Sequence, residues 1–142
     1  MGTKESDKRI GPNLKSGCER ILFVDDEELL RSVVPKMLRA IGYSAECASS
    51  GPETVDEYRK AMDAGNPFDV VIIDLTVKGG ISGEEAVKRL LEIDPEARVI
   101  VSSGYPNAPV MVNYRDYGFI GAIVKPYTSA ELKDLIVEVL GS

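Results

Sequence analysis

The sequence predicts an α/β protein in which a parallel sheet is covered by helices on both faces. Five short strand-like segments alternate with five segments in which apolar residues recur at helical spacing. Most of the strand-like segments are apolar throughout, which is typical of strands buried on both faces. Polar residues follow several of these strands, at the edge where such sheets bind ligands.

The predicted strands are short runs rich in Val and Ile, except for the second, which alternates weakly between polar and apolar residues. Acidic residues, glycines and prolines bound them. Asp74 ends the third strand, which is the most apolar of the five. The predicted strands are residues 20–24, 44–48, 70–73, 98–102 and 122–124.

The predicted helices show apolar residues every three or four positions between cap and stop residues. Gly42 ends the first helix, Ser50 caps the second, and Pro95 stops the third. Pro35 lies inside the first helix and should kink it. The fourth segment is the least amphipathic. The predicted helices are residues 28–41, 50–64, 82–93, 109–117 and 129–140.

Composition limits the classes of function. The 142 residues are 44% hydrophobic and 28% charged, which suits one globular domain. The net charge of -6 and the lack of a clustered basic face argue against direct nucleic-acid binding. No apolar run is long enough to cross a bilayer, and the N-terminus lacks the apolar core of a signal peptide, so we expect a cytoplasmic protein without a membrane segment.

The sequence also indicates the domain organisation. Residues 1–19 are polar, and their apolar residues show neither the helical nor the strand spacing. We therefore predict a flexible leader or linker there and a single domain over residues 20–141. Cys18 and Cys47 have neither metal-site nor disulfide spacing, and we expect both to be reduced.

Three carboxylates follow two of the strands. Asp25 and Asp26 come after the first strand and Asp74 ends the third; if these strands are neighbours, they lie about 4.8 Å apart. The carboxylates repel one another unless one is protonated or a cation joins them. Mg2+ suits the set because it needs few protein oxygens besides waters. We assign Asp26, Asp74 and the backbone carbonyl of Thr76 as direct ligands, and Asp25 as a ligand that can act through water.

The remaining polar residues suit phosphoryl transfer, which needs a nucleophile, charge neutralisation and preorganised donors. Asp74 is the candidate nucleophile and phosphoacceptor, and Lys125 the candidate cation. Donors to the phosphoryl oxygens are the Ser103 hydroxyl and the amides near Thr76 and of Gly104. Thr76 and Tyr105 flank the site and are candidates for shielding or positioning an attacking water.

Each feature also has a simpler interpretation when it is taken alone. The run Asp25 to Glu28 suits a helix N-terminus, and Asp74 a strand-ending cap. Ser102 and Ser103 suit a loop, and a Lys-Pro pair suits a surface. Their joint occurrence at strand ends favours a single site.

These motifs resemble the receiver domain of two-component response regulators from about Arg20 to Gly141. The matching motifs are Asp25-Asp26 after ILFV, Asp74-Leu75 after VVII, Ser103-Gly104 after VIVS, and Lys125-Pro126 after AIV. The resemblance implies a flavodoxin-like (βα)5 three-layer sandwich with sheet order 2-1-3-4-5. It also implies an acidic metal pair at Asp25 and Asp26, a phosphoacceptor at Asp74, a switch hydroxyl at Ser103, a functional Lys125, and a cis bond before Pro126.

The segment from Ser102 to Tyr127 is most similar to receivers at the C-terminus of hybrid sensor histidine kinases. Such a module is a phosphorelay phosphoprotein rather than an enzyme, with at most self-phosphorylation from small donors and autodephosphorylation. Its partner is a histidine kinase or a histidine phosphotransfer domain, and because this chain has no histidine the phosphohistidine must come from that partner. The resemblance also implies signalling, and a homodimer, through the face of the fourth and fifth helices.

Three positions depart from the common pattern of that family. Ala122 stands three residues before Lys125, where an aromatic residue is common, and Lys78 stands where proline is common. Ser103 stands where threonine is commoner, a mild change because it keeps the hydroxyl. Two other functions therefore remain open. A phosphatase of the haloacid dehalogenase type also pairs a nucleophilic Asp with Mg2+ and Lys, but Thr76 occupies the place of its general acid. A receiver-like module that only docks partners is favoured by Ala122 alone.

Overall fold

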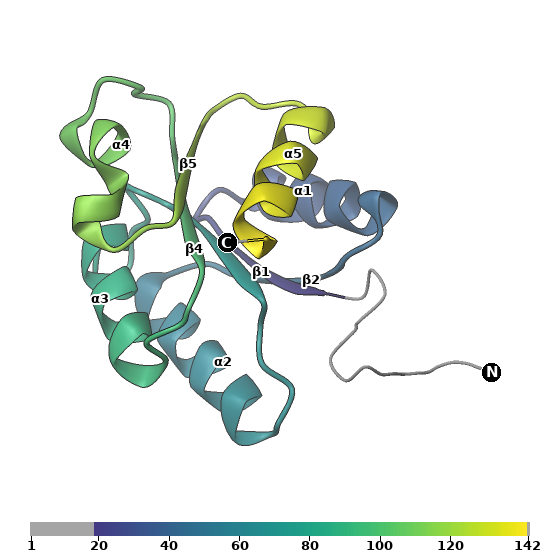
Figure 1. The fold of residues 1–142 in the computed structure, drawn as a ribbon, viewed down its shortest axis with the longest axis vertical. Helices are drawn as coiled ribbons and strands as arrows, with labels where there is room; N and C mark the ends of the chain where they lie inside the picture. The colour runs from purple at the N-terminus through teal and green to yellow at the C-terminus, as the bar shows by residue number, and fades with distance from the viewer. Residues whose placement is uncertain (1–18, 142) are drawn as a thin grey trace.

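The computed structural model describes residues 19–141, which form a three-layer sandwich (Figure 1). A sheet of five strands lies between two groups of helices. On one face lie α1 (Glu28–Ile41) and α5 (Ser129–Leu140), and on the other lie α2 (Gly51–Asp63), α3 (Gly83–Ile93) and α4 (Pro109–Val112). This confirms the predicted fold class.

The sheet is parallel and has the order β2-β1-β3-β4-β5. The strand order therefore reverses between β1 and β3, which places the two predicted acidic strand ends side by side. Ligands bind outside the carboxyl ends of the strands at such a point. The strands are β1 (Arg20–Val24), β2 (Ser44–Ala48), β3 (Val70–Asp74), β4 (Val99–Ser103) and β5 (Gly121–Val124).

Strand alternation decides on which face each polar side chain emerges. In β3, Val71 and Ile73 pack in the cluster under α2 and α3, whereas Val70 and Ile72 pack in the cluster under α1 and α5. Asp74 continues the second series. Its side chain therefore leaves the sheet on the α1 and α5 face, where the apolar cluster ends.

Side-chain caps fix where three helices begin. The hydroxyls of Ser50, Ser82 and Thr128 each accept a hydrogen bond from the backbone N–H three residues later, and Thr128 forms a complete capping box. Each cap satisfies a backbone donor that the first helical turn leaves free. All three helices begin after loops at the carboxyl edge of the sheet, so the caps also fix these loops.

The structure corrects two predicted elements. One helix over residues 109–117 is wrong, because α4 ends at Val112 and a 3-10 helix (Tyr114–Tyr117) follows. Only Val110 and Met111 of these segments are buried, so little apolar surface supports a longer helix. The fourth strand extends to Ser103, which therefore belongs to the sheet and not to the following loop.

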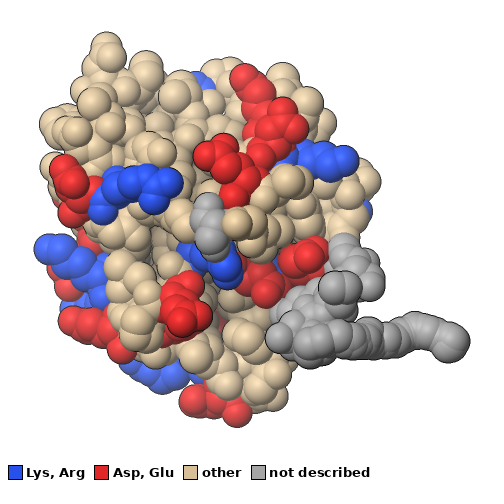
Figure 2. Space-filling model, in the orientation of Figure 1, with Lys and Arg blue, Asp and Glu red and all other residues tan. Residues whose placement is uncertain are grey.

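Other predictions concern the ends and the surface of the chain. Of the predicted leader, residues 1–19, only Glu19 lies within the described residues, and Cys18 lies outside them. Within residues 19–141, no helix combines the length and the apolar character needed to cross a membrane. On the face shown in Figure 2, Lys and Arg side chains are separated by acidic and uncharged residues.

The loop between β3 and α3 packs tightly against the start of α2, which gives a test of how the site is held. A Cβ added to Gly51 would lie 2.4 Å from Ile81 Cγ1 and 2.8 Å from the Ile81 carbonyl oxygen. We expect Gly51→Ala to lower the free energy of unfolding by about 1–3 kcal/mol because the loop must shift. Urea denaturation measures this. Gly104→Ala, whose Cβ meets nothing within 4 Å, is the matched control; equal stability of both variants would contradict the prediction.

Candidate functional site

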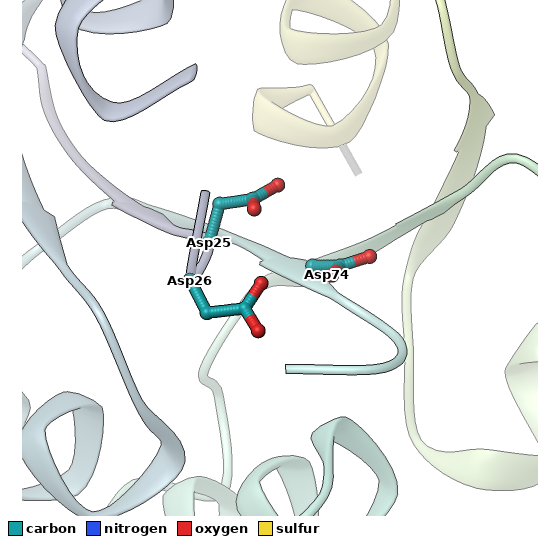
Figure 3. A group of neighbouring side chains, drawn as sticks. All are labelled: Asp25, Asp26 and Asp74. Carbon is teal, nitrogen blue, oxygen red and sulfur yellow. The ribbon is translucent and has the colours of Figure 1, made fainter. Parts of the chain in front are cut away.

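Three carboxylates meet at the carboxyl ends of β1 and β3 (Figure 3). Asp25, Asp26 and Asp74 each offer an oxygen, and these oxygens all lie within 4.8 Å of one another. Asp25 and Asp74 are only 1% and 5% exposed, whereas Asp26 is more open to solvent. The structure thus brings together the three side chains that the sequence predicted as metal ligands.

Lys125 completes this cluster from the end of β5. Its Nζ donates a hydrogen bond of 2.8 Å to Asp25 Oδ2 and lies 3.3 Å from Asp74 Oδ1. One ammonium group therefore bridges the two buried carboxylates. The bond between Lys125 and Pro126 is cis, as the resemblance implied.

The neighbouring helix α1 holds Asp25 in place. The Asp25 Oδ1 atom accepts a 2.9 Å hydrogen bond from the backbone N–H of Glu27. Arg31, one turn into α1, donates through Nη1 to the backbone carbonyl of Asp25 at 2.9 Å. The sequence prediction missed Arg31, because no periodicity distinguishes it from the other charged residues of α1.

The electrostatics of the cluster follow from one cation shared by two buried anions. Burial is the main cause that raises the pKa of Asp74 above its ordinary value of 3.8; Lys125 lowers it and Asp25 raises it. The pKa of Lys125 is also raised, because Asp25 and Asp74 outweigh the opposing effect of burial. The single positive charge of Lys125 therefore does not neutralise the carboxylates fully. This shortage, and an all-oxygen donor set, fit a hard divalent cation.

The predicted phosphate-binding residues differ in their contacts with the acceptor. The Thr76 hydroxyl donates to Asp74 Oδ2 at 3.3 Å, and Thr76 is exposed. The Ser103 Oγ accepts a 3.0 Å hydrogen bond from the backbone N–H of Tyr105. Within residues 19–141 no hydrogen bond joins Ser103 to the carboxylates. Gly104 is exposed, and the space beside its Cα is open.

Comparison with known proteins places this geometry in a family. The family model of the response regulator receiver domain matches residues 21–137. The chain is 28% identical over 122 residues to the chemotaxis protein CheY of Thermotoga maritima, a match that covers 85% of this chain and 97% of that protein. It is 26% identical to the sensor kinase CckA of Brucella abortus, covering 88% of this chain and 13% of that protein.

A solved structure shares the fold. The receiver domain of sensor histidine kinase PA1611 from Pseudomonas aeruginosa, with a magnesium ion coordinated in its active site cleft, superimposes with a TM-score of 0.77 at 20% identity, covering 88% of this chain and 99% of that domain.

The chain belongs to the response regulator receiver family. Receiver domains are phosphoacceptor modules of two-component signalling that interact with histidine kinases or phosphotransfer partners, and they are in general not enzymes. The family therefore favours the first of the three functions that the sequence left open, over the phosphatase and the pure docking module.

Two further residues of this receiver lie beside the ion pair but were not assigned to the site from the sequence. Ser102 pairs with Asp74 in the strand register, and its hydroxyl is buried. Tyr127 follows Lys125 by two residues and has a buried hydroxyl. Strand alternation already separates Ser102 from Ser103, because Ser102 lies inside the predicted strand 98–102 in the series of Ile100. For Tyr127, the sequence offers only its closeness to Lys125.

The raised pKa of Asp74 predicts that the acceptor lowers stability. Between pH 3.8 and its raised pKa, the folded chain binds a proton that the unfolded chain has released, so stability falls as the pH rises through this window. In EDTA at about pH 7, we expect Asp74→Asn to raise the free energy of unfolding by about 0.5–2 kcal/mol. The gain should shrink as the pH falls towards 3.8.

Urea denaturation at several pH values measures this difference. Asp63→Asn, at an exposed position near the end of α2, is the matched control and should change stability little at any pH. A loss of stability in Asp74→Asn at neutral pH would show that the contact between Lys125 and Asp74 outweighs the burial of the carboxylate.

Proposed function

We propose that Asp74 accepts a phosphoryl group from a phosphohistidine of a partner kinase or phosphotransfer domain. The observation that carries this proposal is the convergence of Asp74 with two further carboxylates and the Lys125 ammonium at the carboxyl edge of the sheet. A buried carboxylate at a topological switch point, next to a cation, suits a nucleophile better than a structural cap.

In the proposed step, a carboxylate oxygen of Asp74 forms a bond to phosphorus as the bond between phosphorus and the histidine nitrogen breaks. The imidazole leaves with the bonding electron pair, and the product is an acyl phosphate on Asp74. Lys125 neutralises one phosphoryl oxygen. The Ser103 hydroxyl and the backbone amides near Thr76 and of Gly104 are the proposed donors to the other oxygens.

The same residues are suited to hold Mg2+. Asp25, Asp26 and Asp74 supply carboxylate oxygens, and the backbone carbonyl of Thr76 is the fourth candidate ligand. When bound, the ion supplies the positive charge that the carboxylates and the incoming phosphoryl oxygens need. The magnesium coordinated by the similarly folded PA1611 receiver supports this assignment.

Two exposed side chains beside the acceptor set the proposed lifetime of the acyl phosphate. Thr76 is exposed and reaches Asp74, while Tyr105 is 72% exposed on the loop after β4. Both flank the direction from which water reaches the phosphorus atom. Autodephosphorylation at a rate set by these two side chains is therefore part of the proposal.

An apolar groove next to Lys125 supports the approach of a partner. It has a volume of about 350 Å³ and lies between α1 and the loop after β5. Its lining includes Leu30, Val33 and Met37 from α1 and Pro126 and Tyr127 from the loop. A helix that carries the phosphohistidine can bury apolar side chains there while its imidazole faces Asp74.

The proposal also extends to the parent protein of this chain and to the surface through which it passes on a signal. The resemblance of the segment from Ser102 to Tyr127 to receivers of hybrid sensor histidine kinases, together with the similarity to the sensor kinase CckA, supports a parent protein of that kind. Val112, Val124 and Val137 are 61%, 42% and 55% exposed on α4, β5 and α5. These apolar side chains support a phosphorylation-dependent contact there, including a homodimer. Direct nucleic-acid binding is not part of the proposed function.

Labelling with a small phosphodonor tests the acceptor. We expect acetyl phosphate with Mg2+ to add one phosphoryl group to the wild-type chain, and none to Asp74→Asn, because the nucleophilic oxygen is absent. Intact-protein mass spectrometry measures the addition. Asp63→Asn should be labelled like the wild type. Labelling that persists in Asp74→Asn would refute the assignment of the acceptor.

The role of the ammonium group is tested separately by Lys125→Met, which keeps most of the length of the side chain. We expect phosphorylation of Asp74 to become about 10²-fold slower, because one preorganised positive group is lost from the transition state. Time-resolved mass spectrometry gives the rate. Lys133→Met, at an exposed position of α5, is the control. Unchanged labelling rates in both variants would exclude Lys125 from the reaction.

A further inference from the structure

Two buried hydroxyl groups next to the acceptor have no hydrogen-bond partner in the structure. They are Ser102 Oγ and Tyr127 Oη, and no other buried side-chain nitrogen or oxygen in residues 19–141 lacks one. A buried hydroxyl without a partner costs about 1–3 kcal/mol, which alanine and phenylalanine at these positions would avoid. Because Ser102 pairs with Asp74 in the strand register and Tyr127 follows Lys125 by two residues, one explanation for both hydroxyls is sought at the ion pair.

Ser102 lies between the acceptor and the cation. It is on β4, which separates β3 with Asp74 from β5 with Lys125, and it pairs with Asp74 in the register. It is fully buried and continues the series of Ile100, so its side chain faces α1 and α5 as Asp74 does. Lys125 must cross this strand to reach Asp74.

Tyr127 approaches the same ion pair from the loop after β5. Its ring packs against the apolar cluster under α1 and α5 and lines the apolar groove. Burial, and then the negative charges of Asp25 and Asp74, raise the pKa of its phenol group. The phenol therefore keeps its proton and remains a hydrogen-bond donor near two carboxylates.

We propose that Ser102 and Tyr127 are positioning residues of the phosphorylated site, whose hydroxyls donate to Asp74 and Asp25 when Lys125 turns to the phosphoryl group. This inference rests on the proposed function. In the structure, Asp25 Oδ2 accepts from Lys125, and Asp25 is only 1% exposed. When the ammonium turns to a phosphoryl oxygen, this buried oxygen needs another donor, since an unpaired charged group costs more than a neutral one.

The two hydroxyls have the properties that this exchange requires. In residues 19–141 they are the buried side-chain donors without a partner, and both lie on the face of the sheet from which Asp25 and Asp74 emerge. The exchange explains why polar atoms that destabilise the unmodified state are present. It also links the site to the groove, because Tyr127 belongs to both.

The test uses beryllofluoride, a mimic of a phosphoryl group bound to a carboxylate, together with Mg2+. Urea denaturation without beryllofluoride should give Ser102→Ala and Tyr127→Phe a stability equal to or above that of the wild type. Titration of the folded proteins should show that each variant binds beryllofluoride about five- to tenfold more weakly, since one hydrogen bond to a charged group is lost. A merely structural role would lower the stability of the folded protein together with its affinity for beryllofluoride.

Two controls accompany the test. Ser102→Thr keeps the hydroxyl and should restore binding. Tyr117→Phe removes a hydroxyl from a partly buried tyrosine that packs against the other apolar cluster, and it should bind like the wild type. Wild-type binding with an unchanged affinity in Ser102→Ala and Tyr127→Phe would overturn this inference alone. A wild-type chain that does not bind beryllofluoride would overturn the proposed function as well.

Discussion

The structure depends on one ammonium group that two buried carboxylates share. Lys125 contacts Asp25, which lies 100 residues earlier in the sequence, and also Asp74, so its contacts join the carboxyl ends of β1, β3 and β5. Burial raises the pKa of Asp74, Asp25 adds to this effect, and Lys125, which both carboxylates share, does not reverse it. A group that is both buried and short of positive charge gains from any further cation or donor that arrives. This shortage makes the site receptive to Mg2+ and to phosphoryl chemistry.

The fold supplies this arrangement through two simple geometric rules. Parallel strands end at one edge of the sheet. Alternation sends Asp74, Ser102 and Lys125 to the same face, because the residue two positions before each of them packs under α1 and α5. The reversal of strand order then places Asp25 next to Asp74. Close packing of Gly51 against Ile81 leaves the loop after β3 little freedom. The site is therefore built on strand ends that the core immobilises.

The sequence was sufficient to predict the site residues that lie at strand ends. It was not sufficient to predict features that depend on the direction in which a side chain turns. Asp25, Asp26, Asp74 and Lys125 were predictable because apolar runs mark the strands, and parallel strands share an edge. The break after Val112 was not, since a short segment with two buried residues takes its conformation from tertiary contacts. Arg31 was missed because folding alone brings it to its partner, the backbone carbonyl of Asp25, and Tyr127 was missed because its position near the ion pair exists only in the folded chain. Ser102 already lay inside the predicted strand 98–102, but its full burial and its pairing with Asp74 are properties of the folded chain.

The two faces of the sheet differ in how they can transmit a change at Asp74. Ser103 and Ala122 belong to the face covered by α2 and α3, and the small Ala122 side chain has no rotamer that a movement of Ser103 could shift. On the other face, Lys125 is joined through Pro126 to Tyr127, whose ring packs against the α1 and α5 cluster and the groove. A change in the position of the Lys125 ammonium group therefore acts first on α1 and α5. Under the proposed function, movement of the Lys125 ammonium acts on Tyr127, whose side chain also lines the groove proposed for partner docking.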